Sequence, residues 1–244
     1  MVKWKEGLVM LNEKDVFLNG EADAYFTRNK NTMVAKGEVS YSTKLLVEFL
    51  KNQNKCLDFW KDKEILEVGA CYGYNLKYLQ DNLGTICYGI EPSALAVEFG
   101  KEKYNKEMAE KNIQLQLICG TSDELPYKDL KFDVVILGFC MFWVDRKYLM
   151  KTVSEADRVL KEGGYLVIVD FDTFIPYKKD NVHNPDAWTY KMQYINLFLS
   201  NPQYCLVDKK SFSDDGEKFC KEIQERISFN VLYKDNVDNS YIQD

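Results

Sequence analysis

The residues best suited to chemistry lie in a short run around two glycines, Glu67-Val68-Gly69-Ala70-Cys71-Tyr72-Gly73. There a β-type run ends in an acidic residue, and the glycines permit a tight turn and a close approach of the next helix to a ligand. Glu91 ends the next β-type run, 22 residues after Gly69. A carboxylate at that place can accept hydrogen bonds from both hydroxyls of a ribose. The spacing predicts a nucleoside site, although a glycine turn alone also occurs in α/β proteins of other function.

Later β-type runs end in polar or glycine-bearing turns that complete the predicted site. The third leads into Gly120-Thr121-Ser122-Asp123-Glu124-Leu125-Pro126, which is placed to meet an adenine ring, and the fourth into Gly138-Phe139. Singly, Glu91 could be a solvated acid and Asp123 a turn residue. In order, at the ends of successive strands, they indicate one crevice. The predicted cofactor-binding residues are Glu67, Gly69, Ala70, Gly73, Glu91, Thr121, Ser122, Asp123, Gly138 and Phe139.

Two residues beyond the fifth β-type run are candidates for a general base. His183 is the only histidine of the chain, and its side chain titrates near neutral pH when unperturbed. It lies in a loop expected over the carboxyl edge of the sheet, although a plain surface histidine fits the sequence as well. Asp172, just past that run, is the competing base.

Five β-type runs alternate with helical patterns from Glu64 onward, which is typical of parallel βαβ units. The runs are Glu64–Gly69, Thr85–Glu91, Ile113–Cys119, Asp133–Gly138 and Gly164–Phe171. The fourth and fifth are continuously apolar, as in central strands that are covered on both faces.

The remaining segments predict additions to this core. A helix is expected at Ala187–Leu199, then two β-type runs, Tyr204–Phe212 and Arg226–Tyr233, with a short polar helix between them. The fold class is therefore α/β: a doubly wound, Rossmann-like, mostly parallel seven-stranded sheet with helices on both faces and an N-terminal helical extension. We expect a single domain over 1–244, with a helical cap at 1–63, a cofactor-binding core at 64–171 and the acceptor loop, helix and last two strands at 172–244.

Composition limits the partners. The 244 residues carry a net charge of −6, which argues against nucleic acid and anionic membranes. The N-terminus lacks an apolar signal core and no run is long enough to span a membrane, so we expect a cytoplasmic protein, monomeric or homodimeric. The seven cysteines show no C-x-x-C spacing, so neither disulfides nor a metal site is predicted.

The chain carries in order the stretch Ile65-Leu66-Glu67-Val68-Gly69-x-x-x-Gly73, Glu91, the Gly120–Pro126 turn, Phe132-Asp133-Val134-Val135 and the run from Arg158 to Leu166. Together these motifs resemble those of the class I S-adenosylmethionine-dependent methyltransferases. The resemblance covers roughly Leu45 to Val169 and implies that S-adenosylmethionine is the cofactor. Cys71 stands where the family has its middle glycine, and Thr121 where an acidic residue is usual.

The acceptor is expected to be a small molecule that is methylated on oxygen. Arg28 and Arg146 could hold a carboxylate or phosphate of acceptor or cofactor in bidentate fashion, with Tyr190 and Lys191 nearby, although solvated charge is the alternative. The aromatic run Phe139–Trp143 could line the site or belong to the core. Tyr25-Phe26-Thr27-Arg28-Asn29-Lys30 and the C-terminal half also resemble a bacterial subgroup of capsule and surface-glycan pathways, which implies a phosphate, phosphoramidate or sugar acceptor. The alternatives are an NAD-dependent oxidoreductase and a regulatory protein that binds a nucleoside without chemistry.

Overall fold

The computed structural model describes residues 12–36, 39–54, 56, 58–111, 115–213 and 218–241. Its main sheet has seven strands in the order β3-β2-β1-β4-β5-β9-β8. They are β1 (Glu64–Val68), β2 (Ile86–Glu91), β3 (Leu115–Cys119), β4 (Phe132–Gly138), β5 (Leu160–Phe171), β8 (Tyr204–Ser213) and β9 (Arg226–Lys234). Strands β1 to β5 pair in parallel, and β9 pairs antiparallel with both β5 and β8. The predicted sheet is thus confirmed, apart from the first two residues of the run Ile113–Cys119, which lie outside the described part.

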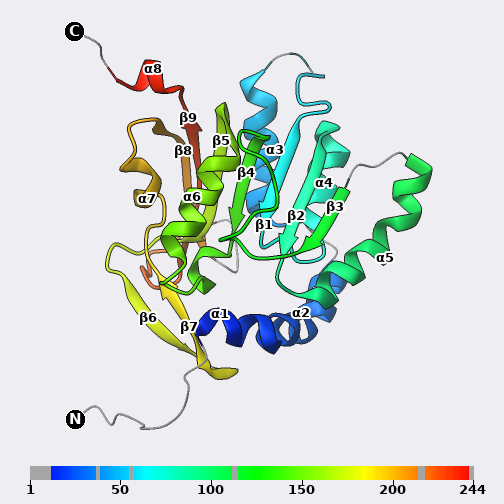
Figure 1. Ribbon diagram of the computed structural model, residues 1–244, viewed down its shortest axis with the longest axis vertical. Helices are drawn as coiled ribbons and strands as arrows, with labels where there is room; N and C mark the ends of the chain where they lie inside the picture. The colour runs from blue at the N-terminus through cyan, green and yellow to red at the C-terminus, as the bar shows by residue number, and fades with distance from the viewer. Residues whose placement is uncertain are drawn as a thin grey trace.

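Helices cover both faces of this sheet (Figure 1). One core contains residues of α3 (Tyr41–Gln53), α4 (Tyr74–Leu83) and α5 (Ala94–Lys111). The other contains residues of α6 (Leu149–Val159) and α7 (Asn196–Leu199). Alternate side chains of β4 enter opposite cores, Val134 the first and Val135 the second, and both are fully buried. Apolar side chains on both faces of the strand explain its continuous apolar sequence.

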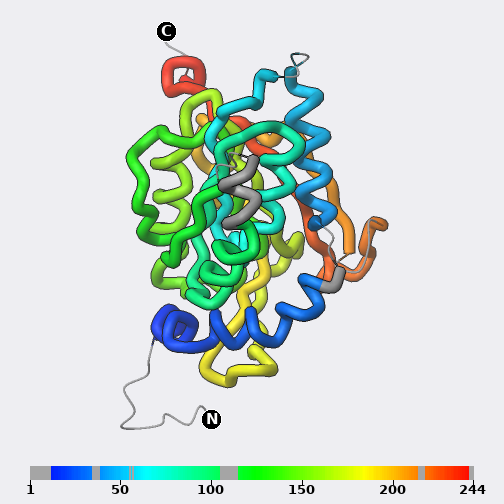
Figure 2. Tube along the Cα trace, turned by 90° about the vertical axis from the view of Figure 1, so that its right-hand side faces the viewer, coloured from blue at the N-terminus to red at the C-terminus, as the bar shows by residue number. Residues whose placement is uncertain are grey.

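The N-terminal helices form a cover that runs beneath the carboxyl ends of the parallel strands (Figures 1 and 2). This N-terminal cover, residues 12–36, consists of α1 (Glu13–Val16), the kinked π-helical stretch η1 (Phe17–Glu21) and α2 (Ala22–Lys36). Asp23 fixes it to the core, because its Oδ1 accepts hydrogen bonds from Ser93 Oγ at 2.6 Å and from Leu95 N at 3.2 Å. The acidic side chain caps the start of α5, where unpaired amides and the helix dipole favour negative charge. The cover therefore lies across the edge of the sheet at which doubly wound folds bind ligands.

A two-stranded hairpin replaces the predicted helix at Ala187–Leu199, and that prediction is wrong. Strand β6 (Tyr177–Asn181) pairs antiparallel with β7 (Asn184–Lys191), and only the α7 residues of the expected segment are helical. The side-chain amides of Asn181 and Asn184 each donate to the buried carboxylate of Glu21 at 3.3 Å. Such contacts with the N-terminal cover outweigh local helix propensity.

The predicted polar helix before Arg226 is also absent from residues 218–225, which form turns and irregular chain. A last short helix, α8 (Val237–Ser240), follows the sheet. Within the described residues, no helix combines the length and the apolar character that crossing a bilayer requires.

Candidate active site

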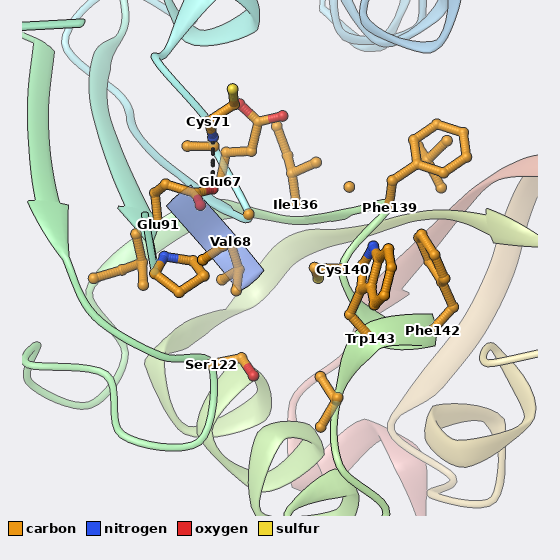
Figure 3. A pocket seen from close by; sticks show the side chains of 18 of the residues that line it. Glu67, Val68, Cys71, Glu91, Ser122, Ile136, Phe139, Cys140, Phe142 and Trp143 are labelled. Carbon is orange, nitrogen blue, oxygen red and sulfur yellow. Dashed lines mark hydrogen bonds between the residues drawn. The ribbon is translucent and has the colours of Figure 1, made fainter. Parts of the chain in front are cut away.

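A cavity of about 650 Å³ lies between the carboxyl ends of the parallel strands and the N-terminal cover. Residues from β1, β2, β4 and β5, from the turn after β3, from α3 and from the cover line it. In Figure 3, Glu67, Cys71 and Glu91 lie on one side of the cavity, and Phe139, Phe142 and Trp143 lie on the other. The volume falls in the range of small-molecule and cofactor sites, about 300–1,000 Å³.

The turn after β1 is built from left-handed residues. Gly69, Cys71 and Gly73 have φ values of 80°, 50° and 81°. A side chain in this region costs roughly 1–2 kcal/mol, so the cysteine in place of the family's glycine holds a strained backbone. Its amide donates to Glu91 Oε2 at 2.9 Å, and Ser93 N donates to Glu91 Oε1 at the same distance. The carboxylate of Glu91 thereby fixes the glycine turn to the end of β2.

Glu67 lies one residue before the end of β1, beside this turn, and is 4% exposed. Its Oε1 accepts a hydrogen bond from Asn75 Nδ2 at 3.1 Å, and its Oε2 is buried with no partner among the described residues. Burial raises the pKa of Glu67 to about 7, against the opposing effect of the Asn75 hydrogen bond. A Cβ added at Gly138 would come to 3.3 Å from Oε1. The cavity wall thus places a glycine beside a carboxylate that has one unsatisfied oxygen.

The predicted adenine turn also lines the cavity, through Thr121, Ser122 and Asp123. Ser122 Oγ hydrogen-bonds Thr152 Oγ1 at 2.9 Å, and Asp123 is paired with Lys14 of the cover at 2.7 Å. Burial raises the pKa of Asp123, but the hydrogen bonds from Lys14 and Thr121 outweigh it and lower that pKa. The Lys14–Asp123 pair ties the cover across the nucleoside end of the cavity.

These residues fit an adenosyl cofactor with an amino group. Each oxygen of Glu91 accepts one backbone amide and has a further lone pair for a ribose hydroxyl. Ile90 and Pro92 add apolar surface next to the adenine turn. The unpaired Oε2 of Glu67 offers an acceptor to an ammonium group. Of the residues predicted for the cofactor, all except Gly73 line the cavity, and Gly73 caps α4 directly behind the turn.

Aromatic rings form the far side of the cavity. The aromatic wall consists of Phe17, Tyr25, Phe142, Trp143 and Phe171, which all line the cavity. The ring of Trp143 lies 5.5 Å from Phe17 and 6.1 Å from Tyr25, and Phe142 lies 5.3 Å from Phe171, centroid to centroid. Among the described residues that line the cavity, Lys14 is the only lysine, arginine or histidine, and it is already paired. This end of the cavity favours an uncharged ring over an anion.

Neither candidate base is among the residues lining the cavity. His183 is exposed in the turn between β6 and β7. Asp172 is buried and accepts hydrogen bonds from Lys209 Nζ and Gln193 Nε2 at 2.8 Å and from Ser211 Oγ at 3.0 Å. Burial raises the pKa of Asp172, but the hydrogen bonds from Lys209 and Gln193 and the charge of Lys209 lower it below its usual range. A carboxylate held in this way is a weak base.

The predicted acceptor-binding residues lie outside the cavity lining as well. Arg28 pairs with the buried Glu21 at 2.5 Å. Arg146 donates to the carbonyls of Met141 and Val144 at 2.7 and 2.9 Å. Tyr190 donates to Glu13 Oε1 at 2.6 Å, and the ammonium of Lys191 lies 3.6 Å from the ring centroid of Phe171. Each side chain is used inside the protein, which leaves the expected anion site without its cations.

Other lining residues were not predicted. Lys14 comes from the cover, and Ser40, Ser42 and Thr43 come from the start of α3. The sequence could not single out Lys14, because its partner Asp123 is 109 positions away and no local pattern connects the two. The sequence allowed the aromatic run after β4 to line the site or to belong to the core, and the run does both. Met141 is buried in the core, while Phe142 and Trp143 line the cavity.

Comparison with known proteins gives a family match over part of the chain. Residues 66–168 match a family model described as a methyltransferase domain. A demethylmenaquinone methyltransferase of Tropheryma whipplei (strain Twist) is 28% identical over 135 residues, 53% of this chain and 53% of that protein. A ubiquinone/menaquinone biosynthesis C-methyltransferase of Rhizobium etli is 32% identical over 91 residues, 37% of this chain and 33% of that protein.

A solved structure shares the fold over nearly the whole chain. It is the 1,6-didemethyltoxoflavin-N1-methyltransferase of Burkholderia thailandensis with bound 1,6-didemethyltoxoflavin and S-adenosylhomocysteine. Its TM-score is 0.66 at 9% identity, and the match covers 95% of this chain and 94% of the other.

Residues 66–168 match a methyltransferase domain, and the fold and the crevice agree with the S-adenosylmethionine-dependent class, whose cofactor is S-adenosylmethionine. The resemblance seen in the sequence is confirmed at this level, whereas the capsule-associated subgroup stays a prediction. The chain spans about half the length of the first curated relatives it matches. The names of the two proteins that specify an accepting atom give carbon and nitrogen, so transfer to oxygen also stays a prediction.

Proposed function

We propose that the protein transfers the methyl group of S-adenosylmethionine to a small acceptor that carries an uncharged ring. The observation that carries this proposal is the two-sided cavity. Its glycine-turn side holds Glu67 and Glu91, and its other side is the aromatic wall. No unpaired cation is among the described residues that line it.

The cofactor brings a methyl group that is already activated, so the chain mainly has to align the acceptor and exclude water. In our proposal Glu91 holds the ribose, Glu67 accepts from the amino group, and Ile90 and Pro92 flank the adenine. The rings of Phe142, Trp143 and Tyr25 then confine the acceptor. Alignment of two bound reactants can contribute roughly 7–11 kcal/mol to the barrier.

The predicted anionic acceptor receives no support from the cavity lining, because Arg28, Arg146 and Lys191 are not among the residues that line the cavity. A buried phosphate without a cation would carry a large desolvation cost. Transfer to oxygen fits an uncharged ring as well, since a ring hydroxyl is one possible acceptor. A role in capsule or surface-glycan biosynthesis stays a prediction from the sequence, and nucleotide sugars belong in its test.

The test is formation of S-adenosylhomocysteine from S-adenosylmethionine with three groups of acceptors. They are uncharged phenols and naphthoquinols, neutral sugars and nucleotide sugars, and phosphorylated metabolites. We expect turnover in the first group only. Turnover confined to phosphorylated compounds would refute the uncharged acceptor but keep the methyltransferase. Failure to bind S-adenosylhomocysteine at all would refute both.

A further inference from the structure

The two central rings of the aromatic wall, Phe142 and Trp143, sit on a very short element. They belong to one turn of 3-10 helix, η2 (Met141–Trp143), which follows β4. Such a turn has few hydrogen bonds of its own and has no side-chain cap at its start. Other parts of the chain must therefore fix the position of these rings.

One support comes from β5. Asp170 is 2% exposed, and its Oδ2 accepts a hydrogen bond from Phe142 N at 3.3 Å. Its Oδ1 accepts from Phe171 N at 2.7 Å. A single carboxylate thus holds the backbone of two neighbouring members of the aromatic wall. Asp170 itself is not among the cavity-lining residues.

The second support is Arg146, which grips the other side of the turn. Its Nη2 donates to Met141 O at 2.7 Å and its Nε donates to Val144 O at 2.9 Å, so it holds the carbonyls at both ends of η2. Only a planar guanidinium offers several donors in one fixed fork. Asp170 thus accepts a hydrogen bond from an amide of the turn, and Arg146 donates hydrogen bonds to its carbonyls.

Arg146 also connects this turn with the N-terminal cover. Its guanidinium carbon lies 4.4 Å from the ring centroid of Tyr190 on β7, and Tyr190 donates to Glu13 Oε1 of α1 at 2.6 Å. From the cover, Phe17 and Tyr25 reach back to the ring of Trp143. The wall and the cover are therefore joined twice, directly by rings and indirectly through Tyr190 and Arg146.

We propose that Arg146 and Asp170 are positioning residues that set the aromatic wall at the acceptor end, and that Tyr190 and Arg146 link that wall to α1. The proposal rests on the proposed function in one respect, that the wall is where the acceptor binds. Neither residue touches the cofactor end of the cavity. Their loss therefore affects acceptor binding and leaves cofactor binding in place.

The experiment compares Arg146→Lys and Asp170→Asn with the wild type by three measurements. Calorimetry gives the affinity for S-adenosylhomocysteine, and calorimetry with the product present gives the affinity for the uncharged ring 2-naphthol. Acrylamide quenching reports the exposure of Trp143, isolated by repeating each measurement in the Trp143→Phe background. We expect 2-naphthol to bind about tenfold more weakly and Trp143 to be quenched about twice as strongly. Binding of S-adenosylhomocysteine should change by less than about twofold.

Arg158→Lys is the matched control. Arg158 also donates to two backbone carbonyls, those of Leu125 and Tyr127, but in a different loop. The Arg158→Lys variant should leave the quenching of Trp143 unchanged. The link through Tyr190 is tested by Tyr190→Phe, which keeps the ring over Arg146 and removes only the bond to Glu13. Quenching should rise in this variant, and Arg146→Lys should add less to it than to the wild type.

The outcomes separate the two proposals. Equal losses for S-adenosylhomocysteine and 2-naphthol would overturn the positioning role, because they would indicate a general defect of folding. Unchanged quenching in both variants would overturn it as well. Independent, additive effects of Tyr190→Phe and Arg146→Lys would overturn the link to α1. A wild type that binds S-adenosylhomocysteine but not 2-naphthol would refute the acceptor assignment, and the quenching would still decide the positioning role.

Discussion

Glu91 serves the structure and the ligand with the same carboxylate. It accepts the amides of Cys71 and Ser93, and it faces the cavity. Burial raises its pKa, while those two hydrogen bonds oppose the rise. A buried carboxylate without such donors would carry a much larger cost. The two amides therefore offset part of the cost of burial and hold the carboxylate of Glu91 where a ribose can reach it.

We expect Glu91→Ala to lower the affinity for S-adenosylhomocysteine by about 100-fold, because two hydrogen bonds from the ribose hydroxyls are lost together. Calorimetry measures this directly. Glu98→Ala, on the exposed side of the neighbouring helix α5, is the control and should bind normally. An affinity within threefold of the wild type, as judged on the scale of about 0.6 kcal/mol, would remove Glu91 from the ribose site.

Glu67 should make the stability of the ligand-free protein depend on pH. Its pKa is about 7 in the folded protein and 4.5 in the reference state. The folded state therefore holds its proton more tightly, and the stability from this group is full below pH 4.5 and is lost as the pH rises to about 7. The loss is about 3 kcal/mol when each pKa unit counts about 1.4 kcal/mol. Glu67→Gln should abolish it.

Urea unfolding of both proteins between pH 4 and 8 measures this effect. The difference in unfolding free energy between Glu67→Gln and the wild type should grow with pH in favour of the variant. Taking the difference removes the contribution of Asp170, whose pKa burial likewise raises to about 7. Glu48→Gln, at an exposed position of α3, should show a flat difference. If the difference in unfolding free energy between Glu67→Gln and the wild type also did not change with pH, Glu67 would not be a buried carboxylate with a raised pKa.

At the scale of residues, the sequence predicts the nucleoside side better than the acceptor side. Glu67, Gly69 and Glu91 are placed by strand ends and a turn, which are local patterns. Arg146 and His183 are predicted from their chemistry and from the segments in which they lie, and no local pattern fixes the partners of their side chains. Only the tertiary structure shows that one holds two carbonyls and that the other lies at an exposed hairpin turn.

At the scale of elements, the N-terminal cover and the β6–β7 hairpin complete a cavity that the parallel sheet only begins. The strands of the core could be predicted because their apolar runs reflect burial on both faces. The hairpin could not, because β6 is polar and mostly exposed, with the sequence Tyr-Lys-Lys-Asp-Asn. It is held by Glu13 and Glu21 of the cover. These partners are more than 150 positions away from the hairpin in the sequence, so a local sequence pattern cannot indicate the contacts.

The cover should slow the release of the cofactor product. We expect Lys14→Ala to raise the dissociation rate of S-adenosylhomocysteine about fivefold, since this partly buried ion pair contributes modestly and changes in affinity appear mainly in dissociation. Stopped-flow displacement measures the rate. Lys44→Ala, at an exposed position of α3, leaves the Lys14–Asp123 pair intact and should release the product as the wild type does. Identical rates for all three proteins would show that this pair does not restrain the site.

At the scale of the whole molecule, cofactor binding and folding are linked. A ligand present at 100 times its dissociation constant stabilises the native state by about 2.7 kcal/mol. For a chain of this size that corresponds to a rise in melting temperature of roughly 5–10 °C. We expect S-adenosylhomocysteine to produce this rise in a thermal melt, and NAD at equal concentration to produce none. Glu91→Ala should remove the effect, and a larger shift with NAD would favour the oxidoreductase alternative.

The long-range contacts of the cover set an order of events during synthesis. Lys14 meets Asp123 only after 109 further residues have been added, and Glu13 meets Tyr190 only after 177. At roughly 5–20 residues per second on the ribosome, the second interval is about ten seconds or more. Phe17 meets Trp143 only after 126 further residues and Phe26 meets Phe99 only after 73, so both rings stay without these partners for roughly several seconds. The segment of the described chain that is made first thus waits for partners that are made much later, and the nascent protein has to keep its aromatic side chains in solution until the site beneath them exists.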